Sequence, residues 1–480
     1  KFSPDDTRLN NELFNLKRRV ADWKGWNQEL VKLSKNVRIQ MSYMPKISLQ
    51  PFQAETYPVE NPLVKEIAEF YAKDALRKAE LQLPDGLRIP KLGQWKFDPA
   101  KKLRVGFISA DFRQHPMGYL MVNLWRYMTG RFDTFCYSTS KNDRSKYRKQ
   151  ISKECQHWND LWGKAEYEMG IKINQDRIHV LLDFNGYTAG HKAEVFAMRP
   201  APVQTLPGVA YFGTWGGKEM QHFLTDRIGS PPEIAQEMHF EKLTYMPNTY
   251  QINDHRQSFD FVLKPEFSTT PREQIGLPED AMVYSNFNSF QKIEPRLFAA
   301  WVAIIKRVPG SVLWLLRNPE EGERRVREEW ERHGLDQKRL QFSDLASPEE
   351  NLARMGASDV HLDTLLFNGH TTSADAMWTG VPVLTTPGVR LPSRVAASFN
   401  TVMDPALVAI TLKEYAALAV RLGLNKHKLR QHKEQIRRGR TESAMYNTEL
   451  WAKDMERAVD AEWQIFAAGL NPYHVVCARN

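Results

Sequence analysis

The sequence predicts an α/β protein built from two Rossmann-like lobes. Two series of short runs rich in Val, Ile, Leu and Phe alternate with helical or loop segments, and this alternation is typical of βαβ units with parallel sheets. At 480 residues the chain is also too long for a single hydrophobic core. Ligands of open parallel sheets bind beyond the carboxyl ends of the strands. We therefore expect two facing lobes with a cleft between them.

The elements are expected in a fixed order along the chain. Residues 1–100 form a helical segment, because 9–37 carry apolar residues at helical spacing and 63–81 do so again after a Pro-rich break. The first lobe is expected over 101–251, a polar connector over 252–280, the second lobe over 281–445 and a C-terminal helix over 446–480. The predicted strands lie in the runs 103–109, 132–138, 178–186, 203–213, 242–247, 282–288, 311–317, 339–345, 360–366 and 382–388.

Composition excludes several classes of protein. Hydrophobic residues at 42% and charged residues at 26% are ordinary for a soluble globular chain, and no apolar run has the length of a membrane span. Three widely spaced cysteines, Cys136, Cys155 and Cys477, argue against a disulfide scaffold or a zinc cluster and fit a cytoplasmic protein, also nuclear if it is eukaryotic. The net charge is +9, and its densest run, 426–440, lacks interleaved aromatic residues. We expect a solvated helix face there rather than a nucleic-acid site.

The stretch "NGHTTSADAMWTG" follows the predicted strand 360–366 and begins a helix. His370, Thr371 and Thr372 place an imidazole, two hydroxyls and unpaired backbone N–H groups at the positive end of that helix. A phosphate or diphosphate suits such a place. The alternative is an ordinary helix start that one of the threonines caps.

Two further residues follow strands where a ligand is expected. Lys292 lies in the loop after the strand 282–288, where its charge could neutralise a phosphate. His115 follows the strand 103–109 in a turn-like Pro-Met-Gly context, where a histidine could act as general base or polar anchor. Each also has an ordinary interpretation, as a surface lysine and a surface loop histidine.

The stretch "NGYTAG" lies after the strand 178–186. Asn185, Tyr187 and Thr188 could hydrogen-bond a polyol there, and the nearby "AYFGTWGG" has glycines at which a backbone could approach a ligand. Neither stretch is a G-x-G-x-x-G fingerprint. The chain also has no P-loop motif and no D-x-D, so neither the P-loop way of binding phosphate nor the metal–diphosphate clamp of many sugar-nucleotide enzymes is expected.

These stretches together resemble the catalytic region of the O-linked N-acetylglucosamine (O-GlcNAc) transferase family. The similarity covers nearly the whole chain and runs in one order through "RVGFISADFRQHP", "NGYTAG", "AMRPAPVQ", "GLPEDAMVYSNFNSFQKIEP", "KRVPGSVLWLLR", "LDTLLFNGHTTSADAMWTGVPVLTTPG" and "LPSRVAAS". It implies a glycosyltransferase fold of the GT-B type, a UDP-sugar donor, inversion at the anomeric carbon, Ser or Thr hydroxyls of proteins as acceptors, and no metal or other cofactor. His370 resembles the UDP-using branch rather than the plant O-fucosyltransferase branch.

The resemblance also implies roles for individual residues. His115 and Lys292 would take the catalytic positions, with Lys292 stabilising the leaving diphosphate. Asn185, Tyr187 and Thr188 would lie near the sugar and acceptor. The donor would contact Ser289, Ala346, Arg354, His370, Thr371, Thr372 and Asp375, with Asp375 near the ribose and Ala346 and Arg354 near the uracil ring.

The chain departs from the family pattern at four positions. Ser289 stands where the family usually has Gln, and Pro348 and Asn351 stand where it has Lys and His beside the nucleotide. Phe367 replaces a small Cys near the N-acetyl group, so it would crowd that pocket. These changes favour keeping two alternatives to GlcNAc transfer: another donor such as GDP-fucose or UDP-glucose, and a non-catalytic scaffold that binds nucleotide or protein.

Two larger features differ from animal members of the family. The long insertion between the lobes is absent, and only the connector at 252–280 stands in its place. No tetratricopeptide array is present, although residues 1–45 resemble the helix that would follow such an array. In the family that array selects protein substrates.

Overall fold

The computed structural model describes residues 7–83, 101–128 and 130–479, and it divides into two compact units. The N-lobe comprises Leu49–Glu55, Val59–Gln257 and Ala444–Asn480, and the C-lobe comprises Lys1–Ser48, Thr56–Pro58 and Ser258–Ser443. Residues 1–6 and 84–100 of the predicted helical segment lie outside the described residues. The chain crosses between the units more than once, and one crossing, between Gln257 and Ser258, falls within the predicted connector.

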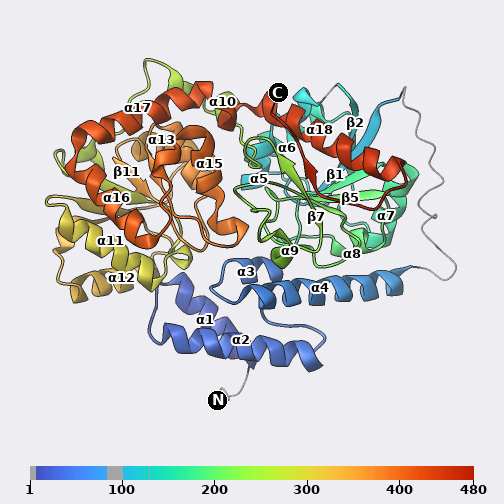
Figure 1. Ribbon diagram of the computed structural model, residues 1–480, viewed down its shortest axis with the longest axis horizontal. Coiled ribbons are helices and arrows are strands. Elements are labelled where there is room, and N and C mark those ends of the chain that lie inside the picture. The colour runs from blue at the N-terminus through green and yellow to red at the C-terminus, as the bar shows by residue number, and fades with distance from the viewer. Residues whose placement is uncertain (1–6, 84–100, 129, 480) are drawn as a thin grey trace. The chain divides into compact units, whose positions relative to one another are not determined.

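The N-lobe is built on a parallel sheet of eight strands in the order β13-β7-β6-β5-β4-β1-β2-β3. Its central strands are almost entirely buried, because helices cover both faces of a parallel sheet. Figure 1 shows α4 along one face and α18 along the other. The strands are β1 (Leu103–Ser109), β2 (Phe132–Ser138), β3 (His157–Asp160), β4 (Val180–Asp183), β5 (Val203–Pro207), β6 (His222–Asp226), β7 (Lys242–Met246) and β13 (Val475–Val476), and the helices are α3 (Pro51–Glu55), α4 (Asn61–Gln82), α5 (Pro116–Met121), α6 (Lys146–Glu154), α7 (Glu166–Gln175), α8 (Ala193–Ala197), α9 (Ala235–Met238) and α18 (Thr448–Ala467).

The C-lobe is built on a parallel sheet of five strands in the order β10-β9-β8-β11-β12. Trp301 on α11 and Trp314 on β9 are fully buried in its core; truncating either to Ala should cost about 3–5 kcal/mol of stability. The strands are β8 (Val283–Asn286), β9 (Val312–Leu316), β10 (Leu340–Ser343), β11 (Val360–Leu362) and β12 (Val383–Leu384), and the helices are α1 (Thr7–Arg19), α2 (Trp26–Tyr43), α11 (Pro295–Arg307), α12 (Glu321–Arg332), α13 (Pro348–Met355), α14 (Thr371–Trp378), α15 (Val395–Met403), α16 (Leu412–Leu424) and α17 (Lys426–Glu442). The short helix α10 (His255–Ser258) spans the boundary between the units.

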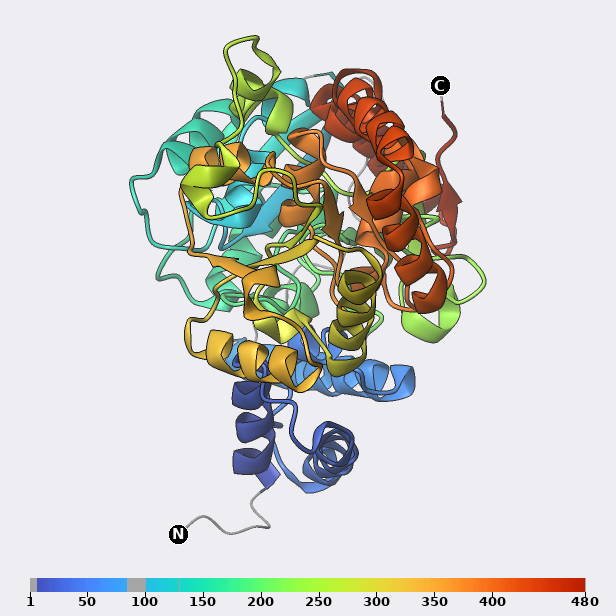
Figure 2. The same cartoon turned by 90° about the vertical axis from the view of Figure 1, so that its left-hand side faces the viewer.

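The helical run predicted over 9–37 is two helices rather than one. Helix α1 ends at Arg19 and α2 begins at Trp26, and Gly25 before it adopts a left-handed backbone (φ 72°). The two helices lie side by side in both views of the molecule (Figures 1 and 2). The ring of Phe14 meets that of Trp26 at 5.4 Å between centroids, so an aromatic contact joins the pair.

The C-terminal helix α18 belongs to the N-lobe. Its Glu462 is fully buried and accepts hydrogen bonds from the hydroxyls of Thr205 on β5 (2.5 Å) and Thr244 on β7 (2.6 Å). After α18 the chain adds the edge strand β13, which pairs in parallel with β7. The amino-acid sequence did not predict this strand, because two residues carry no periodicity.

The structure contains a disulfide, although the wide spacing of the cysteines argued against a disulfide scaffold. Cys136 on β2 and Cys155 after α6 form a disulfide, and Cys477 is the free cysteine. Strand β3 begins two residues after Cys155 and pairs with β2, so the fold brings together two cysteines that lie 19 residues apart in the sequence. No helix of the described chain is long and apolar enough to cross a membrane.

Candidate functional site

The strand order places the predicted N-lobe residues at one point of its sheet. Strands β1 and β4 are neighbours, and the chain leaves them toward opposite halves of the sheet. Such a switch point opens a crevice at the carboxyl ends of the two strands. The loop after β1 carries His115 and the loop after β4 carries Asn185, Tyr187 and Thr188. The structure therefore brings these loops together, as the strand-end argument predicts.

His115 is the N-cap of α5, and its ring has a defined role there. The backbone N–H of Met117 donates to Nδ1 of His115 (3.3 Å), so the ring proton is on Nε2. Burial, with a smaller contribution from Arg113, lowers the pKa of His115 to about 4. About a third of the side chain is exposed. At neutral pH the residue is therefore a neutral imidazole that presents an N–H donor, which favours the polar-anchor interpretation over the general base.

Asp111 is a second ionisable residue of this loop, and it was not among the predicted site residues. Its carboxylate is buried, with Oδ1 3.5 Å from Nδ1 of His115 and 3.5 Å from Nη2 of Arg113. Burial raises the pKa of Asp111 to about 6, against the opposing effects of Arg113 and Asn185. The available signal was an aspartate four residues before a histidine at a strand end.

Asn185 joins the two loops of the N-lobe. Its Oδ1 accepts the backbone N–H of Ala110 (2.6 Å), and its Nδ2 donates to Asp111 Oδ2 and Thr188 Oγ1, both at 3.1 Å. Tyr187 is 3% exposed, and its hydroxyl donates to the carbonyl of Trp215 (2.7 Å). The polar groups of Asn185 and Tyr187 are thus used within the protein, whereas Thr188 is half-buried. Their contact with sugar or acceptor stays a prediction.

The glycines of "AYFGTWGG" serve packing. Gly216 has a left-handed backbone (φ 92°), and a Cβ there would lie 2.3 Å from the backbone of Ala68 on α4. A Cβ at Gly213 would lie 2.2 Å from the Glu55 carboxylate. The close approach at these glycines is therefore made by neighbouring segments of the N-lobe, and the expectation of a ligand there was wrong.

The C-lobe repeats the same topological arrangement with β8 and β11. These strands are neighbours at the switch point of the five-stranded sheet. The loop after β8 carries Ser289 and Lys292, and the loop after β11 carries Phe367 and His370. The Lys292 ammonium joins the loops, because it donates to Asn288 Oδ1 (3.0 Å) and to the carbonyl of Asn368 (2.9 Å).

The surroundings of Lys292 lower its pKa toward neutral pH. Enclosure of the ammonium lowers the pKa of Lys292 to about 8, although the carboxyl of Asp363 opposes this shift. Asp363 is fully buried, and it accepts the backbone N–H of Gly369 (2.8 Å) and the hydroxyl of Thr385 (2.9 Å). Burial raises the pKa of Asp363 to about 6. Asp363 therefore fixes the loop that leads to the helix start at His370.

Helix α14 begins at Thr371, so neither threonine is its cap. His370 is the N-cap residue, and its side chain makes no capping hydrogen bond. Thr371 and Thr372 occupy the first two helical positions, where backbone N–H groups have no acceptor within the helix. The alternative of an ordinary threonine cap was wrong. The side chain of the N-cap residue therefore leaves the first backbone N–H groups of α14 uncapped.

Two buried donors near this helix start have no partner. Asn288 Nδ2 and Ser373 Oγ are both buried, and neither makes a hydrogen bond within the part of the chain that the structure describes. Both flank Gly369, since a Cβ there would lie 3.3 Å from Nδ2 and 2.5 Å from Oγ. A buried unsatisfied donor costs about 1–3 kcal/mol, and both groups can donate to an acceptor that a ligand supplies. We call Lys292, Asn288, Ser373 and the first turn of α14 the anion cradle.

Phe367 lies beside this anion cradle. Its ring centroid is 4.0 Å from Nζ of Lys292, and its ring meets that of His370 edge-on at 5.2 Å. Phe367 is half-buried, so it covers part of the lysine. That this ring crowds the pocket of the N-acetyl group stays a prediction.

The residues predicted near the nucleotide base lie on or beside α13. Arg354 donates to the carbonyl of Asp344 (2.5 Å) and to Asn351 Oδ1 (2.9 Å), and its guanidinium lies 5.2 Å from the ring of Phe287. Ala346 is exposed in the loop before α13, and Asp375 lies on α14 one turn after Thr371. Asn351 thus orients Arg354 through its amide oxygen.

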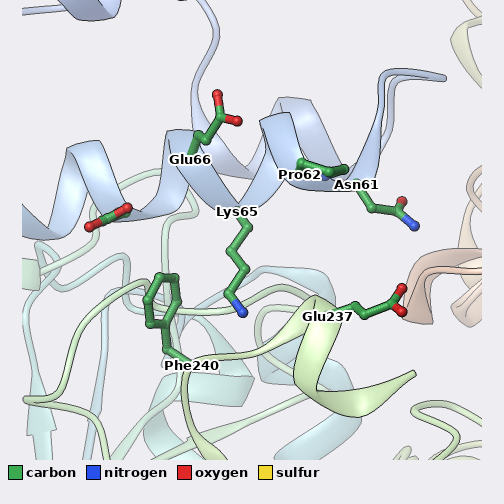
Figure 3. Close-up of a pocket in the computed structure, with 7 residues that line it drawn as sticks. Asn61, Pro62, Lys65, Glu66, Glu237 and Phe240 are labelled. Atoms are coloured by element: carbon green, nitrogen blue, oxygen red, sulfur yellow. The ribbon is translucent and has the colours of Figure 1, made fainter. Parts of the chain in front are cut away.

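A separate pocket lies in the N-lobe beside α4 (Figure 3). Its volume is about 370 Å³, and no predicted site residue lines it. The ammonium of Lys65 donates to the carbonyls of Gln236 (2.8 Å) and His239 (3.3 Å) and lies 4.6 Å from the ring centroid of Phe240. These contacts attach α4 to the segment around α9, which is a packing role. The lining residues are Asn61, Pro62, Lys65, Glu66, Glu69, Glu237 and Phe240.

Comparison with known proteins supports the same fold. The family model described as glycosyl transferase family 41 matches residues 20–267 and 262–455. A structure of Thermobaculum terrenum O-GlcNAc transferase, a lysine-to-methionine mutant, superposes with a TM-score of 0.77 at 22% identity, covering 97% of this chain and 86% of that one. The predicted GT-B type of fold is confirmed by this match.

Two curated relatives match nearly all of the chain. A protein of Arabidopsis thaliana named a probable UDP-N-acetylglucosamine–peptide N-acetylglucosaminyltransferase is 35% identical over 96% of this chain and 47% of its own length. A UDP-N-acetylglucosamine–peptide N-acetylglucosaminyltransferase of Caenorhabditis elegans is 29% identical over 95% of this chain and 49% of its own length. The chain spans about half the length of these relatives. The chain belongs to glycosyl transferase family 41.

Proposed function

We propose that the protein is an inverting glycosyltransferase that needs no metal ion and moves GlcNAc from a UDP donor to Ser or Thr hydroxyls of proteins. The names of the two relatives support the donor sugar and the peptide acceptor. Family membership supports the reaction type. The site residues that carry the proposal are Lys292, His370 and the start of α14 in the C-lobe, with His115 in the N-lobe.

The observation that carries the proposal is the anion cradle. A diphosphate needs several donors and a positive charge, and the anion cradle holds the Lys292 ammonium, the unpartnered donors of Asn288 and Ser373, and the uncapped N–H groups of α14. Fixed donors and charges of this kind stabilise charge that develops in a transition state. Lys292 would supply the charge that a metal ion supplies in other sugar-nucleotide enzymes.

The proposed reaction is a single displacement. The acceptor oxygen attacks the anomeric carbon from the face opposite UDP, the bond from that carbon to the diphosphate oxygen breaks, and UDP leaves with the bonding electron pair. The acceptor hydroxyl loses its proton to solvent. Lys292 and the start of α14 would stabilise the negative charge on the departing UDP, and His115 would hold a substrate oxygen through its Nε2–H group.

Two observations favour keeping the alternatives under test. The ring of Phe367 lies 4.0 Å from the Lys292 ammonium, which favours a donor whose sugar is smaller on that side than GlcNAc. Asn351 and Pro348 replace the stacking ring and charge expected beside the base, which favours a nucleotide-binding scaffold with weak turnover.

A donor-hydrolysis screen with UDP-GlcNAc, UDP-glucose and GDP-fucose tests the proposal directly. We expect release of UDP from UDP-GlcNAc by the wild-type protein and release at least about 10²-fold slower by a Lys292→Met variant. The matched control is Lys306→Met, since Lys306 is an exposed lysine on α11 outside the anion cradle. Preference for another donor would replace the sugar in the proposal. Binding of UDP without hydrolysis of any donor would support the scaffold.

A further inference from the structure

An exposed basic segment lies beside the loop that carries His115. The nine residues 141–149, "KNDRSKYRK", connect β2 to α6 and form the first turn of that helix. Four of their cations are exposed, namely Lys141, Arg144, Lys146 and Lys149. We call these four residues the basic loop. The fifth cation, Arg148, is buried and pairs with Asp160 at 2.7 Å.

Direct contacts hold the basic loop against the His115 loop. The carboxylate of Asp143 accepts the backbone N–H of Gln114 (2.8 Å) and that of Ser145 (3.0 Å). A second contact lies further along both segments, where the ring of Tyr147 meets the ring of Tyr119 on α5 at 4.4 Å between centroids. These contacts fix the basic loop at the same carboxyl edge of the N-lobe sheet as His115.

The charge of the basic loop is not balanced locally. None of its four cations forms an ion pair with any residue in the described ranges, and the one acid between them, Asp143, offsets only one of the four charges and accepts backbone N–H groups. Some other exposed cations of the N-lobe do have partners. Lys453 on α18, for example, pairs with Glu449 one turn earlier at 2.6 Å. The unpaired cations therefore project a positive field over the surface next to His115.

We infer that the basic loop binds acidic segments of the protein acceptor, rich in Asp and Glu, and holds them next to His115. The inference rests on the proposed function, since it takes the carboxyl edge of the N-lobe to be the acceptor side. A nucleic acid fits this surface less well, because the rings of Tyr119 and Tyr147 pack on each other, which leaves less ring surface on which bases could stack. Exposed charge pairs of this kind set partner preference and association rate.

A pair of labelled peptides tests the inference. Each is a 13-residue peptide with a central Ser, flanked in one by Asp and Glu and in the other by Asn and Gln, so that only charge differs. Binding is measured by fluorescence anisotropy on the whole chain, and transfer from UDP-GlcNAc is measured separately. The test variant changes the four cations of the basic loop to Gln. The control variant removes an equal charge elsewhere by changing Arg421, Lys426, Lys428 and Arg430 to Gln, all exposed on α16 and α17.

We expect the wild-type protein to bind the acidic peptide roughly tenfold more tightly than the neutral one, the order that a few exposed ion pairs supply together. The basic-loop variant should lose this preference and the control variant should keep it. Raising NaCl from about 0.1 M to about 1 M, which shortens the screening length from about 10 Å to about 3 Å, should abolish the preference in the wild type.

Three results of the peptide experiment would overturn the inference. These are equal binding of both peptides by the wild type, a preference that survives in the basic-loop variant, and equal loss in the control variant. Binding of a single-stranded oligonucleotide as tight as that of the acidic peptide would also overturn it. If the acidic peptide binds through the basic loop but receives no sugar, the proposed function fails while the surface assignment stands.

Discussion

The two switch points of the molecule share a topology but differ in how their polar groups are used. In the N-lobe, Asn185 bonds to Ala110, Asp111 and Thr188, so its amide joins the loops after β1 and β4 and has no unsatisfied group. In the C-lobe, Asn288 and Ser373 keep buried donors without partners beside Gly369. The amide of Asn185 is therefore satisfied within the protein, whereas the donors of Asn288 and Ser373 have no acceptor among the described residues.

This difference indicates that the two lobes would bind different substrates. Unpaired buried donors reduce the stability of the free protein, and this reduction is recovered when an anion accepts their hydrogen bonds. The C-lobe therefore has the features of a preorganised site for one small anionic ligand. The N-lobe offers the Nε2–H group of His115 and an exposed positive surface, which suits a variable polypeptide.

The largest expected effect on this comparison comes from removing the Lys292 ammonium in the C-lobe. Lys292→Met keeps the apolar stem and removes the ammonium, so we expect turnover of the preferred donor to fall by about 10²–10³-fold, as for other transition-state donors. Steady-state transfer assays measure this, with Lys306→Met as the matched control. Equal activity of the wild type and Lys292→Met would remove the anion cradle from the mechanism.

The unpaired donors give a sharper test, because binding and stability should move in opposite directions. Ser373→Ala and Asn288→Ala should each weaken UDP binding by about tenfold, the loss of one hydrogen bond to a charged acceptor. For Ser373→Ala, the melting temperature without ligand should stay the same or rise, since an unsatisfied hydroxyl is removed. Calorimetric titration and thermal unfolding measure the two quantities.

The control for Ser373→Ala is the same substitution at Ser311. That hydroxyl is buried like that of Ser373, but it donates to the carbonyl of Val308 (2.7 Å) and accepts from Arg339 (2.9 Å). Ser311→Ala should therefore lower the melting temperature and leave UDP affinity unchanged. A destabilised Ser373→Ala protein with normal UDP affinity would contradict the role of the donors.

The pH dependence of UDP binding tests the state of Lys292. Its pKa of about 8 in the free protein should rise when a diphosphate is bound, so above pH 8 binding must take up a proton. UDP affinity should then be flat with respect to this group below pH 7 and fall by up to about tenfold per pH unit above pH 8. A Lys292→Arg variant, charged throughout, should not show this fall. A wild-type profile that matches the Arg variant would contradict the lowered pKa.

Substitution of His115 should have a smaller effect, and it distinguishes a polar anchor from a general base. If its Nε2–H group is the active part, His115→Gln should keep part of the activity, because the Gln amide can donate from a similar position, whereas His115→Ala should lose about fivefold to tenfold in kcat/KM. Nitrogen-15 NMR of the wild-type protein should show a neutral ring protonated on Nε2. Equal loss in both variants would favour the general base.

Sequence reasoning predicted the features that depend on local pattern. The run that became β9, "VLWLL", is continuously apolar because both faces of a central parallel strand are buried. The strand-end argument placed His115 and Lys292 at the switch points. Strand β3, "HWND", was missed because an edge strand with exposed ends carries no apolar run. The unpaired state of Asn288 and Ser373 depends on which groups meet in three dimensions, so the sequence could not show it.

The smallest expected effect concerns Tyr187, in the loop after β4 of the N-lobe. Tyr187 was predicted to contact a polyol, but its hydroxyl donates to Trp215 within the core. Tyr187→Phe should therefore cost about 0.5–1.5 kcal/mol of stability, since it leaves the Trp215 carbonyl without that donor, and should leave KM for donor and peptide unchanged. Denaturant unfolding and steady-state assays measure these quantities. A raised KM at unchanged stability would show that Tyr187 reaches the substrate, and the two switch points would then differ less than their free structures indicate.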